Sequence, residues 1–152
     1  MTLPKGGAVD LLSQVDELIA NAPDDPATVA AVQAIAPILY EEAQRYGQTV
    51  YYVLQTRDGQ WQVITLEEQH PPHRQKNVIH AYGSQVMAQE ACDEELIPVA
   101  MPIIPLLFQL LAADPVDSLI LYEADGERGW EVARESLLAQ VRAILSAPPD
   151  IA

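Results

Sequence analysis

The sequence is poor in cysteine, in basic residues and in glycine, and each scarcity excludes a class of protein. Because Cys92 is the only cysteine, no internal disulfide can form. Eight Lys and Arg residues stand against 22 Asp and Glu residues, and the net charge of −14 repels nucleic-acid phosphates and anionic lipid surfaces. The seven glycines form no glycine-rich phosphate loop. We therefore expect neither nucleic acid nor a membrane as a partner.

The N-terminal segment MTLPKGGAVDLL lacks the charged start and apolar stretch of a signal peptide. With no disulfide and no export signal, the predicted location is cytoplasmic. One long apolar run is present, LIPVAMPIIPLLFQLLAA at residues 96–113. It contains Pro98, Pro102 and Pro105, which interrupt helical hydrogen bonding, and no Lys or Arg flanks it. The run is therefore predicted to be folded core, with Pro98 on an edge strand.

Periodicity and turn residues predict the order of elements along the chain. The N-terminal part predicts two helices, the second capped by Asp25, kinked or split at Pro37 and ended by Gly47. A hairpin with an Asp58-Gly59 turn is expected next. The predicted helices span residues 9–19, 26–47, 85–92 (capped by Ser84), 102–113 and 134–145, and the strands span 49–56, 60–67, 77–82, 96–101, 117–123 and 130–134.

This order predicts an α+β fold, in which a small mixed or antiparallel sheet is covered by helices and preceded by an N-terminal helical pair. Apolar residues make up 49% and charged residues 20%, as is typical of a globular chain. We expect a single domain over residues 1–152, with a helical hairpin at 1–47, an α+β core at 48–146 and a frayed tail at 147–152.

Three segments resemble the SseB-like family, named after the N-terminal domain of the enhanced-serine-sensitivity protein. They are VYYVLQTRDGQWQVITL, then VIHAYGSQVMAQEA with Tyr82, Ser84 and Ala88, and then IPVAMPIIPLLFQLLAADPVDSLILYEADGERGWEVARESL. The resemblance covers about residues 49–138 and rests on hydrophobic patterns and turns. It implies a regulatory or interaction role and brings no catalytic residues with it.

A metal site is the alternative that the residues leave open. His70 and His73 form an H-x-x-H pair in the segment HPPHRQKNVIH, and His80 follows on the expected strand. Three imidazoles could bind zinc and support a small metal-dependent enzyme. Pro71 and Pro72 hold the pair extended, however, and neighbouring Arg74 and Lys76 add positive charge, so a solvated loop is the simpler interpretation.

The sequence carries no G-x-S-x-G motif, no suggestive Ser–His or Cys–His pairing, and no well-placed pair of carboxylates. We therefore predict a protein that is not an enzyme, that has no catalytic residues and no cofactor, and that interacts with a protein partner or with itself. Amphipathic aromatic residues of the sheet, together with the apolar helix after Pro105, are the expected contact residues. These interaction candidates are Tyr52, Trp61, Tyr82, Phe108 and Trp130. An acidic face that binds a basic partner is a further possibility.

Overall fold

The computed structural model describes residues 10–146, which form five helices and a six-stranded sheet in the predicted order. The fold class is α+β with an N-terminal helical pair, as predicted. The helices are α1 (Leu11–Ala20), α2 (Pro26–Ala43), α3 (Gln85–Ala91), α4 (Ile103–Ala112) and α5 (Arg134–Leu145). The strands are β1 (Val50–Thr56), β2 (Ile64–Glu67), β3 (Gln75–Tyr82), β4 (Leu96–Pro102), β5 (Ser118–Tyr122) and β6 (Gly129–Ala133). The expected tail at 147–152 and the first residue of the predicted N-terminal helix, Val9, lie outside the described residues.

The sheet is mixed, with strand order β4-β1-β3-β5-β6 and β2 paired to the outer half of β3. Strands β3 and β5 are parallel, whereas the other pairs are antiparallel. Pro98 lies on β4, which is an edge strand, as predicted. A proline is tolerated there because one side of an edge strand forms no hydrogen bonds with a neighbouring strand, so the missing N–H is not needed.

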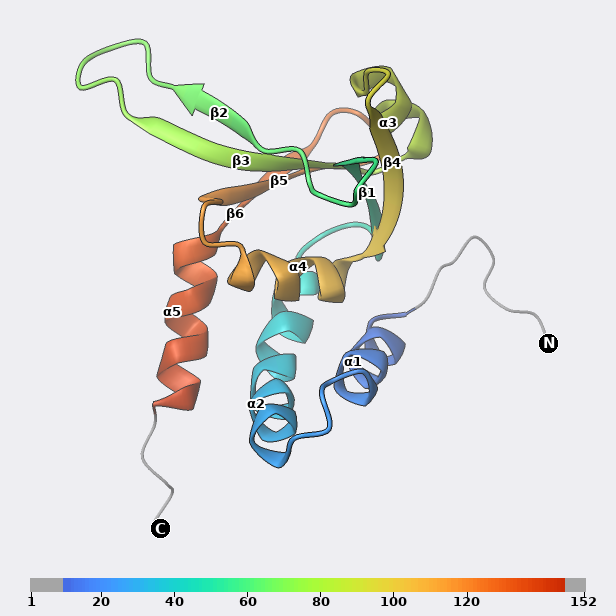
Figure 1. Cartoon of the computed structure of the whole chain (residues 1–152), viewed down its shortest axis with the longest axis vertical. Coiled ribbons are helices and arrows are strands. Elements are labelled where there is room, and N and C mark those ends of the chain that lie inside the picture. The colour runs from blue at the N-terminus through green and yellow to red at the C-terminus, as the bar shows by residue number, and fades with distance from the viewer. Residues whose placement is uncertain (1–9, 147–152) are drawn as a thin grey trace, which may run out of the picture.

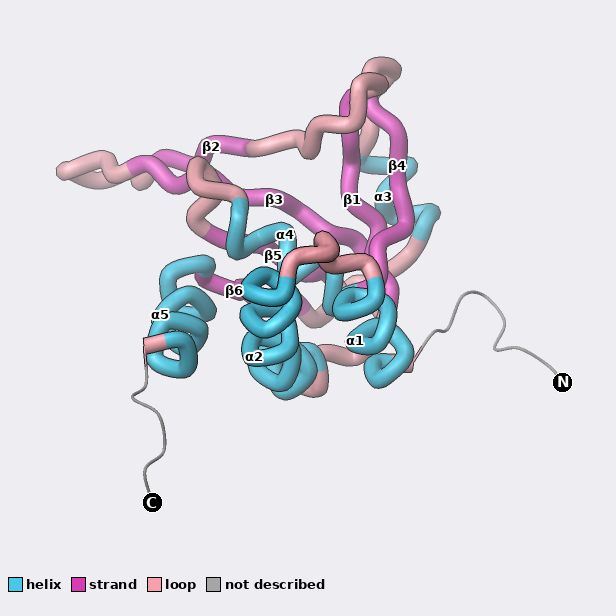
Figure 2. Tube along the Cα trace, turned by 60° about the horizontal axis from the view of Figure 1, so that its bottom comes forward, coloured by secondary structure: helices cyan, strands magenta, loops and turns pink. Residues whose placement is uncertain are grey.

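The helices divide unequally between the two faces of the sheet. In Figure 1, α1, α2, α4 and α5 lie on one side of the sheet, and α3 lies on the other, beside β1 and β4. Figure 2 shows the same helices grouped below the strands, with the β2–β3 hairpin projecting away from them. Among the described residues, therefore, no helix covers the face opposite α4 over β5 and β6, and α3 reaches β3 only near its end.

The core lies between the sheet and α2, α4 and α5. Strand residues that alternate toward these helices, such as Val53, Ala81 and Leu121, are fully buried. Helix α4 is the middle of this core, as its all-round apolar sequence predicted. Its buried residues are Ile103, Ile104, Leu106, Leu107 and Leu110. Within residues 10–146, no helix is both long and apolar enough to cross a membrane.

Helix α1 is attached to this core by one buried polar side chain. The Gln14 amide donates from Nε2 to the carbonyl of Thr49 at 2.9 Å, and its Oε1 accepts the backbone N–H of Ile104 at 2.8 Å. These bonds join α1 to the start of β1 and to the first turn of α4. A helix N-terminus has backbone N–H groups with no partner within the helix, so Gln14 acts as a cap supplied from another element.

The predicted hairpin between residues 49–56 and 60–67 is wrong except at its turn. Gly59 does adopt a positive φ of 89°, and the two segments are joined by a single bridge between Gln55 and Trp61. Beyond that bridge β2 leaves β1 and pairs with β3, while β4 takes the place beside β1 along all seven residues of that strand. The local turn signal was correct, but it does not determine which strand pairs with the segment that follows.

The predicted end of α2 also differs from the structure, and α5 is only partly buried. Pro37 does not split α2, which continues from Pro26 to Ala43 with Asp25 as its N-cap, as expected, and ends before Gly47. Gly47 instead lies where its backbone N–H donates to Glu123, at 3.1 Å. In α5 only part of the apolar face is buried, since Leu137 and Val141 are buried and Ile144 is exposed.

Candidate functional site

The uncovered part of the sheet carries a row of tyrosines. Strand register places Tyr82 of β3 between Tyr52 of β1 and Tyr122 of β5, and all three are half-buried. The rings of Tyr82 and Tyr122 are stacked, with centroids 5.3 Å apart and planes at 12° to each other. Side chains two residues apart on a strand share a face, so His80 lies on this side as well.

His80 packs against both rings. Its centroid lies 5.3 Å from that of Tyr122 and 6.2 Å from that of Tyr82, with edge-to-face angles of 82° and 83°. Burial lowers the pKa of the His80 imidazole and raises the pKa of the Tyr82 phenol, because the charged form of each group loses water. We call His80, Tyr82 and Tyr122 the aromatic cluster. Its members are half-exposed aromatic side chains, which are the kind of residue that often binds other molecules.

A pair of opposite charges borders the aromatic cluster. Lys76 of β3 and Glu131 of β6 form an ion pair, and Ser118 of β5 donates to the same Glu131 oxygen at 2.6 Å. Hydrogen bonding from Lys76 and then from Ser118 lowers the pKa of the Glu131 carboxyl group. The charges of Lys76 and Glu131 neutralise each other, so the edge of this face is polar but carries little net charge.

The structure places the five predicted interaction residues in different surroundings. Tyr82 lies on the open sheet face, and Tyr52 points to the same side from β1, beside α3. Trp61, Phe108 and Trp130 instead pack against the hydrophobic core with partial exposure. Sequence reasoning missed Tyr122 and His80 as members of the aromatic cluster. The alternation of residues along SLILY could have indicated which face of the strand Tyr122 occupies. It could not have indicated that β5 pairs with β3, which is what brings Tyr122 beside Tyr82.

A buried carboxylate on the other face holds several elements together. Glu123, which is 2% exposed, accepts three hydrogen bonds on the same oxygen, Oε2. The donors are the Tyr51 hydroxyl at 2.9 Å, the Trp130 indole at 2.8 Å and the Gly47 backbone N–H at 3.1 Å. Burial and then the Glu123 bond raise the pKa of Tyr51. A carboxylate oxygen so fully used is an anchor for the fold rather than a base for catalysis.

The loop beside Glu123 is held in place by the side-chain amide of Gln48. The Gln48 side chain donates to the carbonyl of Gly83 at 2.7 Å and accepts the N–H of Ala124 at 2.7 Å. Gly83 has no room for a larger residue, because a Cβ there would lie 2.4 Å from the Ala124 nitrogen. The chain therefore turns from β3 into α3 in direct contact with the end of β5, and the Ser84 side chain caps α3 at this point, as predicted.

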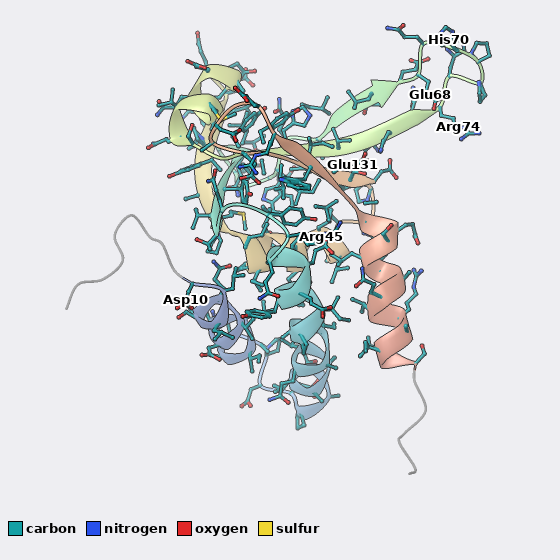
Figure 3. All side chains as sticks on the ribbon, turned by 180° about the vertical axis from the view of Figure 1, so that it is seen from behind. Asp10, Arg45, Glu68, His70, Arg74 and Glu131 are labelled. Atoms are coloured by element: carbon teal, nitrogen blue, oxygen red, sulfur yellow. The ribbon has the colours of Figure 1, made fainter. Side chains whose placement is uncertain are left out.

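The three histidines of the metal hypothesis are separated. His80 lies in the aromatic cluster, whereas Figure 3 shows His70 at the far tip of the β2–β3 hairpin. His73, near that tip, has its Nδ1 3.0 Å from the Glu68 carbonyl and 4.0 Å from a Glu67 carboxylate oxygen. Among residues 10–146 no group of three His, Cys, Asp or Glu side chains is placed to hold a metal ion. The described residues therefore give the zinc hypothesis no support.

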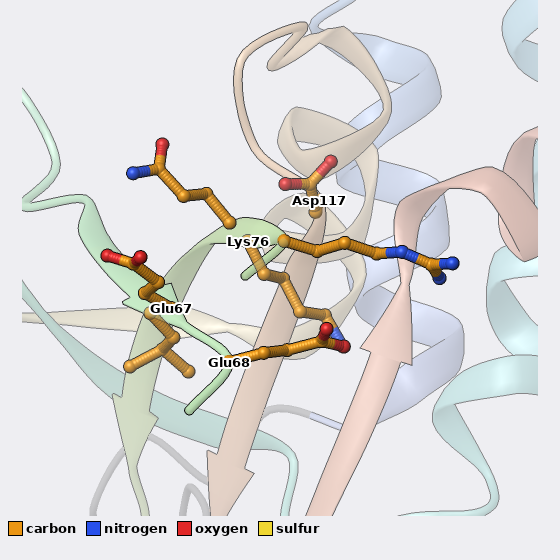
Figure 4. A pocket seen from close by; sticks show the side chains of 7 residues that line it. Glu67, Glu68, Lys76 and Asp117 are labelled. Carbon is orange, nitrogen blue, oxygen red and sulfur yellow. The ribbon is translucent and has the colours of Figure 1, made fainter. Parts of the chain in front are cut away.

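A shallow hollow of about 420 Å³ lies where the hairpin meets the start of β5. Figure 4 shows Glu67, Glu68, Lys76 and Asp117 around it. Two of these groups already have partners, since Lys76 binds Glu131 and the Asp117 carboxylate accepts the backbone N–H of Asn77 at 2.8 Å. The hollow is open and of mixed charge, which does not favour proton transfer or a particular ligand.

The fold and its surfaces define an α+β protein with an open aromatic sheet face. No protein-family model and no curated protein sequence matches the chain. The resemblance of residues 49–138 to the SseB-like family therefore stays a prediction.

Proposed function

We propose that this chain is a non-catalytic, cytoplasmic interaction module that binds a protein partner through its open sheet face. The observation that carries the proposal is the aromatic cluster of His80, Tyr82 and Tyr122, stacked and half-exposed on the sheet face that no described helix covers over β5 and β6. Rigid aromatic side chains lose little conformational entropy on binding and contribute much of the energy at protein interfaces. The cytoplasm is part of the proposal because a single cysteine permits no internal disulfide.

The chemistry of the partner follows from charge. With a net charge of −14, two copies of this chain repel each other, whereas a partner with a basic surface is attracted. Tyrosine faces also bind Arg and Lys side chains by cation–π contact. We therefore expect a basic segment of another protein rather than a second copy of this one. A role as an SseB-like regulatory protein is compatible with this proposal and rests on the sequence resemblance alone.

A photo-activated crosslinking residue placed at Tyr82 tests the proposal in the native cell. We expect a discrete crosslinked species that is lost when Tyr122 is changed to Ala and weakens as salt concentration rises. The same crosslinker at Gln33, an exposed position on α2 on the helical side of the sheet, is the matched control. Identical crosslinks from both positions, or none from Tyr82, would refute the proposal. A product of twice the chain mass would mean self-association instead of a basic partner.

A further inference from the structure

A small hollow lies on the helix-covered side of the molecule, between α2, β6 and α5, and is separate from the open sheet face. Its volume is about 180 Å³. Glu42 lines it from α2, Arg45 and Tyr46 from the segment that follows this helix, Trp130 from β6, and Gln140 from α5. A second, more open hollow of about 310 Å³ shares Glu42, Arg45 and Gln140 and adds Glu41, so the two hollows are adjacent.

Two aromatic rings form a corner in this hollow. The centroids of Tyr46 and Trp130 are 5.6 Å apart, and their planes meet at 63°. Neither ring is free to turn away, because the Trp130 indole is hydrogen-bonded to buried Glu123 and the Tyr46 hydroxyl is hydrogen-bonded to Glu42. Aromatic rings set at an angle, beside a carboxylate, are the arrangement by which proteins recognise alkylammonium groups.

The carboxylate of that arrangement is Glu42, which is 9% exposed. Its cationic neighbour is Arg45, whose Nη1 lies 3.6 Å from Glu42 Oε1, beyond the range of a good hydrogen bond. The Arg45 side chain is 65% exposed, so the pair is loose and costs little to separate. Glu131 contributes no charge inside the hollow, since its carboxylate is bound to Lys76 and Ser118 on the opposite face. Glu41, Glu42 and, behind Trp130, Glu123 leave the surroundings of the hollow negative.

We propose that this hollow is a binding site for an organic ammonium group, in which Tyr46 and Trp130 contact the cation and Glu42 neutralises it. Arg45 occupies the entrance in the absence of the cation and moves into solvent when the cation binds. Val132 and Leu137 also line the hollow but are almost fully buried, so the ligand's apolar contacts would be with the rings of Tyr46 and Trp130. The proposal does not depend on a partner for the open sheet face.

Tryptophan fluorescence provides the test. The chain has two tryptophans, so Trp61→Phe leaves Trp130 as the sole reporter. Tetramethylammonium chloride is titrated into this variant, and sodium chloride at equal ionic strength is the control. We expect a saturable change in Trp130 emission with the organic cation alone. An equal response to both salts would overturn the proposal.

Three further variants in the same background separate this site from general electrostatics. Arg45→Ala should tighten binding about two- to fivefold, because a competing cation is removed. Arg142→Ala, which removes an exposed α5 cation outside the hollow, is the matched control and should leave binding unchanged. Glu42→Gln should weaken binding about fivefold or more, because a cation at contact distance loses its counter-charge.

Circular dichroism checks that each variant is folded. If Glu42→Gln does not fold, the comparison of Arg45→Ala with Arg142→Ala decides the question. Equal affinities in those two variants would contradict the proposal, since Arg45 would then not occupy the site.

Discussion

The hydrogen bond from Tyr51 to Glu123 should contribute measurably to the stability of the fold. Tyr51 is fully buried and donates its hydroxyl to Glu123 Oε2 at 2.9 Å. Tyr51→Phe removes this oxygen and its proton while keeping the ring, so the apolar packing is unchanged. A hydrogen bond to a charged acceptor is worth about 1.5–3 kcal/mol, and we expect the unfolding free energy to fall by that amount. For a chain of this size the melting temperature should fall by roughly 3–12 °C.

Tyr52→Phe is the matched control, because the same atom is removed from the adjacent residue on the opposite face of the strand. Because Tyr52 is only half-buried, Tyr52→Phe should lower the unfolding free energy by no more than about 0.5 kcal/mol. Urea unfolding followed by circular dichroism measures both variants, and equal m-values show that the unfolded states are comparable.

A double-mutant cycle with Glu123→Gln then isolates the charge. In the Glu123→Gln variant, Tyr51→Phe should lower the unfolding free energy by only about 0.5–1.5 kcal/mol, the value for a hydrogen bond between uncharged groups. If Tyr51→Phe and Tyr52→Phe cost the same, the Glu123 anchor is not a significant source of stability and the reasoning fails.

Four other outcomes are expected. Gln14→Ala should lower the unfolding free energy by about 1–3 kcal/mol and speed hydrogen exchange at Ile104, whose buried N–H loses its acceptor; unchanged exchange there would contradict the bond. Gly83→Ala should destabilise the fold by about 1–3 kcal/mol, whereas Gly129→Ala, where the nearest atom to the new Cβ is 3.4 Å away, should cost far less. Stability should fall as the pH drops below about 6.5, because the lowered pKa of His80 means that the unfolded chain binds the proton more readily, and His80→Gln should remove part of this slope. Treatment with a chelator should leave the melting temperature unchanged, and a marked fall would revive the metal hypothesis.

Most of the elements could be predicted because their signals are local. Asp25 and Ser84 were recognised as N-caps from side chains that can accept backbone N–H groups at the start of a helix, and the structure confirms both. Pro98 placed β4 at an edge for an equally local reason, the missing donor. The pairing of β2 was missed because a tight turn at Gly59 sets the direction of the chain for only a few residues.

The candidate sites were less accessible to sequence reasoning. Tyr82 was expected at a surface, but Tyr122 becomes its stacking partner only through a parallel pairing that spans three intervening elements, α3, β4 and α4. Trp130 was expected in the sheet, yet its role depends on Glu123, from the loop after β5, and on Tyr46, from the segment after α2. Glu123 was expected only as the last residue of the predicted strand at 117–123, and its burial reveals it as an anchor.

Composition, capping and periodicity along the chain determined the fold class, the order of the elements and the apolar run at residues 96–113 as core, because each depends on interactions between residues close in sequence. The tertiary structure decided which strands are neighbours, which aromatic rings meet and which carboxylates are buried. These depend on contacts between distant segments, whose formation reflects the packing of the whole chain rather than any single stretch of it.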